Sequence, residues 1–369
     1  MLRGRLIPIM LVLMSLAMAG GPLLAQETAQ TLPAQHRLDT DRIGHLYQSW
    51  NNCSGATITM GLSYYGMPAA QPADQNPARD YLKPNTEDQN VSPWQIVDYV
   101  NEIAGPSLGN VRAIARRGGD IDLLRTLLAN DFPVIIEKGF NPPDEDWMGH
   151  YLLMIGYDDA QQVFFTYDSF LGHGNYQGRQ ENYDHIDEMW GHFNDAFIVL
   201  YPEPRETELQ ALMGDLWDED SAWRYAWNQA AEQASLDQND YWAWFNLGEA
   251  ATALGEYETA TQAYRVALDS QQMPWRALWY LHGAFEAFYQ TGQFDTVLEL
   301  ATNLQAITPY IEEANYYRGL VYAAQGNTEQ ALFRLQLVLD FNPNFYPASE
   351  TIQAIQDGTF VGPQPAGAG

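Results

Sequence analysis

Residues 47–66, YQSWNNCSGATITMGLSYYG, contain the only cysteine of the chain, Cys53. Small residues follow the cysteine, apolar side chains then recur at helical spacing, and Gly66 and Pro68 end the pattern. Cys53 is therefore predicted to lie at or just before the N-terminus of a helix, where the helix dipole and unpaired amides stabilise a thiolate. The alternative interpretation is a small structural side chain buried in a core helix.

A second stretch, residues 149–172, reads GHYLLMIGYDDAQQVFFTYDSFLG and predicts a β-hairpin. The expected strands are 150–157 and 163–169, joined by a polar turn that centres near Ala160. Together with the cysteine helix, this hairpin predicts an α+β domain in which a helix packs on an antiparallel sheet.

The hairpin also offers a base for the thiol. With the turn at Ala160, His150 lies opposite Phe170, and Asp168 is its diagonal neighbour at roughly 7–8 Å between Cα atoms. A carboxylate at that position can orient the imidazole so that its other nitrogen faces Cys53. Cysteine, histidine and an orienting acid are the groups that covalent acyl transfer needs.

An oxyanion hole is the remaining requirement of such a site. Gln48 precedes Cys53 by five residues, and its side-chain amide could donate to an oxyanion beside the Cys53 backbone N–H. Zinc chemistry is not expected, because His185 and His192 lack a suitable spacing and the chain has no second cysteine. No cofactor is predicted.

These residues resemble the C39-like branch of the papain-like cysteine peptidases, over roughly residues 40–200. The resemblance implies that Cys53 is the nucleophile, His150 the base and Asp168 the orienting group, and that Gln48 contributes to the oxyanion hole.

Two departures from the family pattern are visible. The family commonly has Cys-Gly-Pro where this chain has Cys53, Ser54 and Gly55. Its glutamine often precedes the cysteine by six residues, compared with five here.

The second half of the chain repeats itself. Gly255, Gly292 and Gly326 occur at spacings of 37 and 34 residues, each within a similar pattern of aromatic and small side chains. This pattern resembles the tetratricopeptide repeat and implies an all-α solenoid over residues 207–356 with a surface for a peptide or protein. The middle copy departs most, with Phe285 at a position where the repeat has a small residue.

The N-terminus has the features of an export signal. Arg3 and Arg5 precede an apolar run over residues 6–18, and cleavage is expected after Ala19 or Ala25, so residues 1–25 are predicted to be a signal peptide. An uncleaved anchor is the alternative. No other segment is apolar and long enough to span a membrane, which predicts a secreted or extracytoplasmic protein.

The formal charge of the chain is −29, and it becomes −31 without residues 1–25, which hold two arginines and no acids. Such a charge disfavours nucleic acid as a partner. Residues 34–203 are predicted to form the peptidase-like domain, and the Gly/Pro-rich residues 357–369 a disordered tail.

The function that these features predict is a secreted cysteine peptidase whose repeat domain recruits a peptide or protein. Two alternatives remain open. One is a non-catalytic adaptor, and the other is a different acyl transferase with the same triad, such as a transglutaminase or an amidase.

Overall fold

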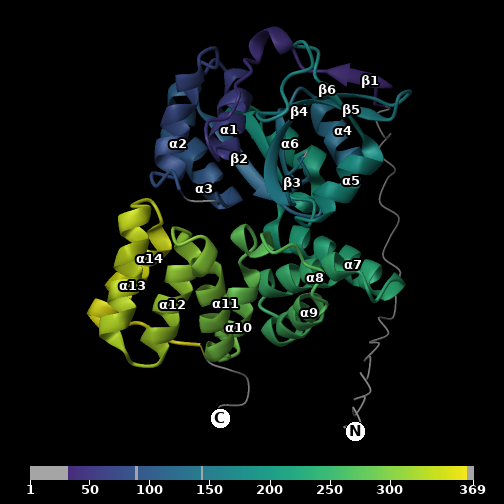
Figure 1. Ribbon diagram of the computed structural model, residues 1–369. Helices are drawn as coiled ribbons and strands as arrows, with labels where there is room; N and C mark the ends of the chain where they lie inside the picture. Colours follow the sequence, from purple (N-terminus) through teal and green to yellow (C-terminus); the bar gives the residue numbers. More distant parts are fainter. Residues whose placement is uncertain (1–31, 88–89, 143, 364–369) are drawn as a thin grey trace. The chain divides into compact units, whose positions relative to one another are not determined.

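The computed structural model describes residues 32–87, 90–142 and 144–363, and the chain from Pro33 onward forms one compact unit. The predicted signal peptide, residues 1–25, lies outside the described residues. Figure 1 shows a sheet flanked by helices in the first part of the chain and helices throughout the second part.

The N-terminal region is built on one sheet. Within the described residues, seven strands form an antiparallel sheet in the order β2-β7-β3-β4-β5-β6, and β1 pairs with β4. All residues of β3 and β5 and nearly all of β4 are buried, so both faces of the central strands are covered. The strands are β1 Gln35–Arg37, β2 Val111–Arg116, β3 Val134–Phe140, β4 Met148–Asp158, β5 Val163–Tyr167, β6 Arg179–Asn182 and β7 Phe197–Pro202.

The predicted cysteine helix is confirmed, because α1 Cys53–Ser63 begins at the cysteine itself. It packs closely on the sheet at Gly61, where an added Cβ would lie 2.7 Å from a methyl group of Leu200. The other helices of this region are α2 Asn76–Leu82, α3 Pro93–Asp98, α4 Ile121–Ala129, α5 Tyr183–Gly191 and α6 Glu206–Met213.

The predicted hairpin is confirmed as β4 and β5, but its register changes once. Near the turn, Asp158 pairs with Val163, one residue away from the predicted pairing. Beyond an irregularity in β4, Leu153 pairs with Tyr167, which is the predicted pairing. The bulge therefore cancels the offset at the turn and brings His150 level with the residues that follow β5.

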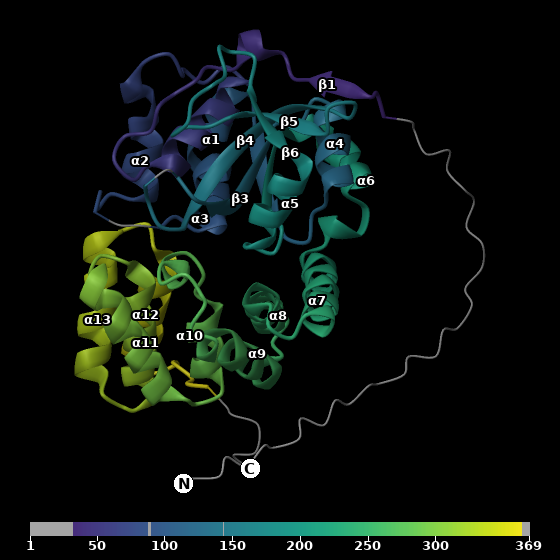
Figure 2. The ribbon, with the colours of Figure 1, turned by 45° about the vertical axis from the view of Figure 1, so that its right-hand side comes forward.

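The C-terminal region consists of helix pairs. Tight turns at Gly255, Gly292 and Gly326 each join the two helices of one pair. Each glycine has a positive φ, of 76°, 72° and 77° respectively. Figure 2 shows the helices succeeding one another along this region. They are α7 Glu219–Leu236, α8 Tyr241–Ala253, α9 Tyr257–Asp269, α10 Gly283–Gln290, α11 Phe294–Ile307, α12 Glu312–Ala324, α13 Thr328–Phe341 and α14 Tyr346–Asp357.

The helices of one pair approach closely at Gly248, where an added Cβ would lie 2.7 Å from the ring of Tyr264. We expect Gly248→Ala to lower the free energy of unfolding by about 1–3 kcal/mol, because the buried ring must shift. Thermal melting of Gly191→Ala is the matched control, since its new Cβ would meet nothing closer than 3.9 Å. Equal melting temperatures for the two variants would contradict close packing at Gly248.

The middle pair is irregular, as its sequence suggests. Its first helix, α10, has 8 residues, whereas α8 and α12 have 13 each. The segment before α10 instead extends toward the N-terminal region, where Trp275 Nε1 donates to Asp146 Oδ2 at 3.1 Å and Tyr280 packs beside Gly149.

The helical region contacts the N-terminal region near both of its ends. Near α8, Asn246 Nδ2 donates to Gly191 O at 2.5 Å. Beyond α13, Asn342 Nδ2 donates to Leu82 O at 3.2 Å. A cavity lies between these two attachments and is described further below.

The chain after α14 is described as far as residue 363. The Phe360 N–H donates to Ala354 O, and the ring packs against the helical core. Residues 364–369 of the predicted tail lie outside the described part. Among the described helices, none is both apolar and long enough to cross a membrane.

Candidate active site

Cys53 is the first residue of α1, and the loop before it is held firmly. Asn52 is fully buried, and its Nδ2 donates at 2.7 Å to Gln75 Oε1, which also accepts the Ser49 N–H at 2.8 Å. The first turn of α1 contains no acidic residue to oppose a negative charge. The thiol therefore lies at a fixed helix N-terminus, the setting that stabilises a thiolate.

The unusual Ser54 and Gly55 have a local explanation. An added Cβ at Gly55 would lie 2.5 Å from Asn52 Oδ1, so the glycine makes room for the buried amide. Ser54 is itself buried. The packing of Asn52 within this loop therefore explains why glycine occupies position 55 in place of the proline of Cys-Gly-Pro.

His150 and Asp168 are brought together as the hairpin register predicts. His150 Nε2 lies 3.1 Å from Asp168 Oδ1, and both side chains are almost completely buried. The same oxygen accepts the N–H groups of Phe170 and Leu171 at 2.7 and 2.9 Å. Phe140 stacks on the imidazole with ring centroids 4.7 Å apart. The carboxylate and the ring are therefore held in one orientation.

Cys53 and His150 line the same small pocket, and each affects the pKa of the other. Burial alone would raise the pKa of Cys53, but His150, the Tyr151 N–H and the charge of Lys83 lower it below its usual value. Burial would lower the pKa of His150, but Asp168 and Cys53 raise it to about 9. Each group therefore favours the charged form of the other.

Asp168 remains ionised near neutral pH. Burial opposes its charge, but His150 and two backbone N–H groups hold its pKa well below the usual range. The ionised carboxylate therefore stabilises the positive charge of the imidazolium.

Gln48 contacts Ser169, the residue that follows Asp168. Its backbone N–H donates to Ser169 O at 2.8 Å, and its Oε1 accepts from Ser169 Oγ at 2.8 Å. Among the described residues, Gln48 does not line the pocket around Cys53. Its predicted role in the oxyanion hole stays a prediction.

Two charged residues that were not predicted from the sequence, Lys83 and Glu137, also line the Cys53 pocket. Both are almost fully buried. Burial raises the pKa of Glu137 to about 8, despite the nearby Arg117. Glu137 was detectable as an acid within the apolar strand VIIEKGF, whereas nothing in the sequence around Lys83 distinguishes it from a surface lysine.

Lys83 donates to Asn51 O and lowers the pKa of the Cys53 thiol through its charge. We expect Lys83→Met to move the alkylation profile of Cys53 to higher pH and to slow alkylation at pH 6–7, with little change at high pH. Iodoacetamide kinetics measure this profile. Lys83→Arg keeps the charge and should keep the profile, so a shift of equal size in both variants would contradict the electrostatic role.

The pocket around Cys53 is nearly closed, with a volume of about 10 Å³. Tyr280, from the segment before α10, forms part of its wall and hydrogen bonds with the Gly149 backbone. Among the described residues, no group of three or more His, Cys, Asp or Glu side chains is arranged to hold a metal ion.

Comparison with known proteins agrees with this fold. Residues 29–201 match the model of the Peptidase_C39 like family. A solved structure from Bacillus anthracis, itself provisionally named a C39-like peptidase, is similar at 12% identity with a TM-score of 0.35, covering 45% of this chain and 97% of the other. No curated protein matches the chain. The antiparallel sheet with its helices fits a papain-like domain, so the N-terminal region has a cysteine peptidase-like fold.

Proposed function

We propose that the protein is a papain-like cysteine peptidase that hydrolyses peptide bonds through Cys53, His150 and Asp168. The observation that carries this proposal is the geometry of the three groups: a thiol at a helix N-terminus shares one small pocket with an imidazole that a buried carboxylate orients. The family match over residues 29–201 supports the same activity.

In this mechanism the Cys53 thiolate attacks the carbonyl carbon of the scissile bond, and a C–S bond forms. The Cys53 backbone N–H and the Gln48 amide stabilise the oxyanion. The His150 imidazolium gives its proton to the leaving amine as the C–N bond breaks. Water, which passes a proton to His150, then attacks the thioester, releases the acid product and restores the thiolate.

We further propose that the helical region is a tetratricopeptide-repeat domain that recruits a peptide or protein, and that residues 1–25 direct export. The glycine turns within the helix pairs support the repeat assignment. The proposed limits are residues 34–203 for the peptidase domain and 207–356 for the repeats.

One observation favours the non-catalytic alternative. The pocket around Cys53 has a volume of only about 10 Å³, which is too small for a peptide unless Tyr280 moves. An adaptor would keep this wall in place, whereas a peptidase must open it.

Labelling with a peptidyl vinyl sulfone, read by intact mass and peptide mapping, separates these possibilities. A peptidase should be modified at Cys53 much faster than an ordinary thiol, and His150→Ala should slow the modification. Because Cys53 is the only cysteine, the label needs no cysteine-free background. Labelling no faster than that of a free peptide thiol would support the adaptor, and amine-capped products from a peptide substrate would support a transferase.

A further inference from the structure

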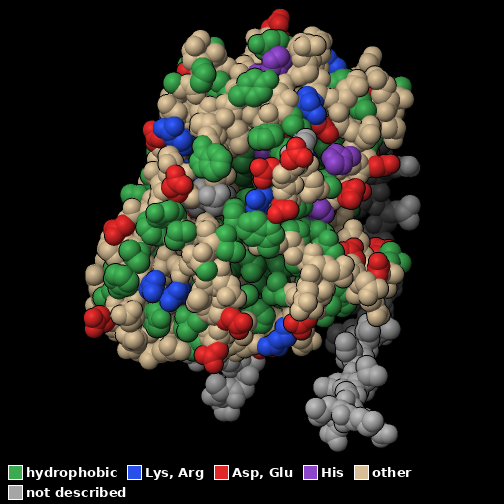
Figure 3. Space-filling view, viewed as in Figure 1, with side chains coloured by type: hydrophobic (Ala, Val, Ile, Leu, Met, Phe, Trp, Pro, Cys, Tyr) green, Lys and Arg blue, Asp and Glu red, His purple; other side chains and the backbone are tan. Residues whose placement is uncertain are grey.

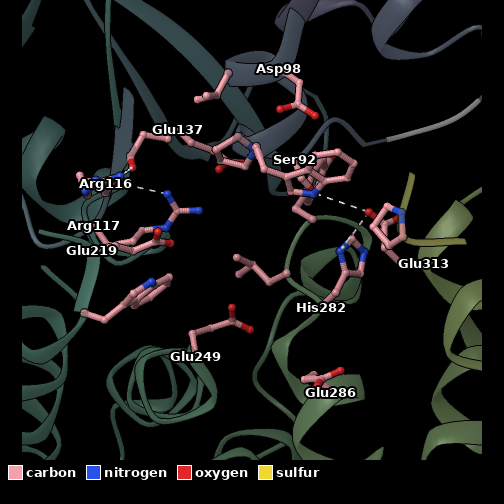
Figure 4. A pocket seen from close by; sticks show the side chains of 18 of the residues that line it. Ser92, Asp98, Arg116, Arg117, Glu137, Glu219, Glu249, His282, Glu286 and Glu313 are labelled. Atoms are coloured by element: carbon pink, nitrogen blue, oxygen red, sulfur yellow. Dashed lines mark hydrogen bonds and ion pairs between the residues drawn. The ribbon is translucent and has the colours of Figure 1, made fainter. Parts of the chain in front are cut away.

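A second and larger space lies between the two regions of the molecule. It has a volume of about 590 Å³, within the range of ligand-binding pockets. The N-terminal region supplies one wall, from residues 92–98, 113–117 and Glu137, and helices of the C-terminal region supply the other (Figure 4). Hydrogen bonds from Asn246 to Gly191 and from Asn342 to Leu82 join the two regions.

The lining of this cavity is strongly acidic. Two basic side chains, Arg116 and Arg117, also line it, and both donate to backbone carbonyl oxygens. Among the described residues, neither arginine forms an ion pair with a carboxylate of the cavity. The carboxylates that line the cavity are Asp98, Glu137, Glu219, Glu249, Glu286 and Glu313.

Glu313 is the clearest sign of a missing cation. Its side chain is only 9% exposed, and its Oε2 is buried without a hydrogen-bond partner. Its Oε1 has long contacts, 3.4 Å to Asn90 Nδ2, 3.5 Å to Ser92 Oγ and 3.6 Å to His282 Nδ1. Burial lowers the pKa of His282 to about 3, so this imidazole is neutral and does not balance the carboxylate. In Figure 4 Glu313 and His282 lie at one side of the cavity and Glu249 and Glu286 below it.

The hydrogen-bond partners of Glu249 and Glu286 are also uncharged. Each accepts hydrogen bonds from neutral groups, Glu249 from the Tyr264 hydroxyl and Glu286 from the Gln290 amide. Burial raises the pKa of both carboxyls, and for Glu249 the charge of Arg117 offsets this only in part. A positively charged ligand would supply the missing partner.

The aromatic residues that line the cavity favour a ligand whose positive charge is carried at the end of an apolar chain. Aromatic rings can hold the methylene groups of such a side chain and attract its charge. On the face shown in Figure 3, hydrophobic side chains gather over the middle of the helical region, with acidic and basic side chains beside them. The aromatic residues of the cavity are Trp94, Trp223, Tyr280, Tyr316, Tyr317 and Phe345.

The cavity adjoins the candidate active site. Glu137 and Tyr280 line both the cavity and the pocket around Cys53, so a single layer of side chains separates the two spaces. A chain bound in the cavity could reach the thiol if Tyr280 moved aside.

We propose that this cavity binds the basic segment of a peptide, a lysine or arginine side chain beside the bond to be cut, and presents the neighbouring residues to Cys53. The position relative to the scissile bond rests on the proposed peptidase function, whereas the preference for basic peptides does not. The carboxyl groups and aromatic rings of the walls thus define the substrate class.

Binding to the full chain carrying Cys53→Ala tests the preference without turnover. The probes are the capped peptides Ala-Ala-Lys-Arg-Ala-Ala and Ala-Ala-Gln-Met-Ala-Ala, and the measurement is isothermal titration calorimetry. The basic peptide should bind at least about tenfold more tightly, and Glu286→Gln and Glu313→Gln should each weaken it about tenfold. Glu299→Gln, an exposed acid on α11, makes the same charge change and should leave the affinity unchanged.

Equal affinities for the two peptides, or equal effects of all three glutamine variants, would overturn the proposal. Spermidine that binds as tightly as the basic peptide would overturn the peptide assignment. Melting temperatures show whether each variant is folded. Turnover by the unmodified protein separates the two proposals: basic peptides that bind without being cleaved refute the peptidase alone, and cleavage without preference for basic residues refutes the cavity's role alone.

Discussion

Replacement of Cys53 by alanine is expected to abolish peptide hydrolysis, with kcat/KM reduced by roughly 10⁴-fold or more. The thiolate is the attacking group in the proposed mechanism, and the single cysteine leaves no other thiol to take its place. The fold should be retained, because Cys53 is only partly buried and alanine is well accepted at the first position of a helix. Hydrolysis of a quenched fluorescent peptide measures the loss.

The matched variant is Cys53→Ser, which keeps a hydrogen-bonding group beside His150 but replaces the thiol by a hydroxyl that does not ionise near neutral pH. It should be almost as inactive as the alanine variant. An alanine variant that cleaves peptides as fast as the unmodified protein would refute the cysteine peptidase mechanism.

Removing the orienting carboxylate should have the next largest effect. Asp168→Ala is expected to lower kcat by roughly 10³-fold, because the ring of His150 loses the acceptor 3.1 Å away that holds it and stabilises its positive charge. Asp168→Asn should lower kcat much less, by about tenfold. All three contacts of the carboxylate use Oδ1, and an asparagine oxygen at that position can accept the same hydrogen bonds.

The pH dependence distinguishes charge from orientation. Asp168 makes the largest contribution to the upward shift that brings the pKa of His150 to about 9. The alkaline limb of the kcat/KM profile should therefore move to lower pH in Asp168→Asn. An unchanged alkaline limb, with activity lost equally in both variants, would mean that Asp168 acts only by holding the loop.

The same pair should make stability depend on pH. The pKa of His150 is raised from 6.5, so its contribution is complete below pH 6.5 and is lost as the pH rises toward about 9. The pKa of Asp168 is lowered from 3.8, so its contribution is present above pH 3.8 and is lost as the pH falls further. The pair therefore stabilises the fold most between pH 3.8 and pH 6.5.

Short-range patterns explain why much of the candidate site could be predicted. The helix after Cys53 and the hairpin that carries His150 each lie within one continuous stretch, and their periodicities are local. The register that brings Asp168 beside His150 depends on one short turn and on the bulge in β4. The prediction of this pairing benefited from two offsets that cancel, one at the turn and one at the bulge in β4.

Gln48 shows what local inference leaves open. Its distance from Cys53 along the chain is known, but the direction of its side chain depends on Ser169, which is 121 residues away. A resemblance to a family motif predicts a role for the residue, and the loop conformation decides where its amide points.

Local sequence was sufficient to predict the helix that begins at Cys53, the hairpin that carries His150 and the glycine turns within the C-terminal helix pairs, because each depends on residues that are neighbours along the chain. The burial of Lys83 and Glu137, the position of Tyr280 in the wall of the thiol pocket, and the acidic cavity between the two regions follow from the tertiary structure alone. These features depend on contacts between distant segments, such as Asn342 with Leu82, 260 residues apart. The physical reason is that burial and the net electrostatic field are properties of the assembled surfaces, and no local periodicity encodes them.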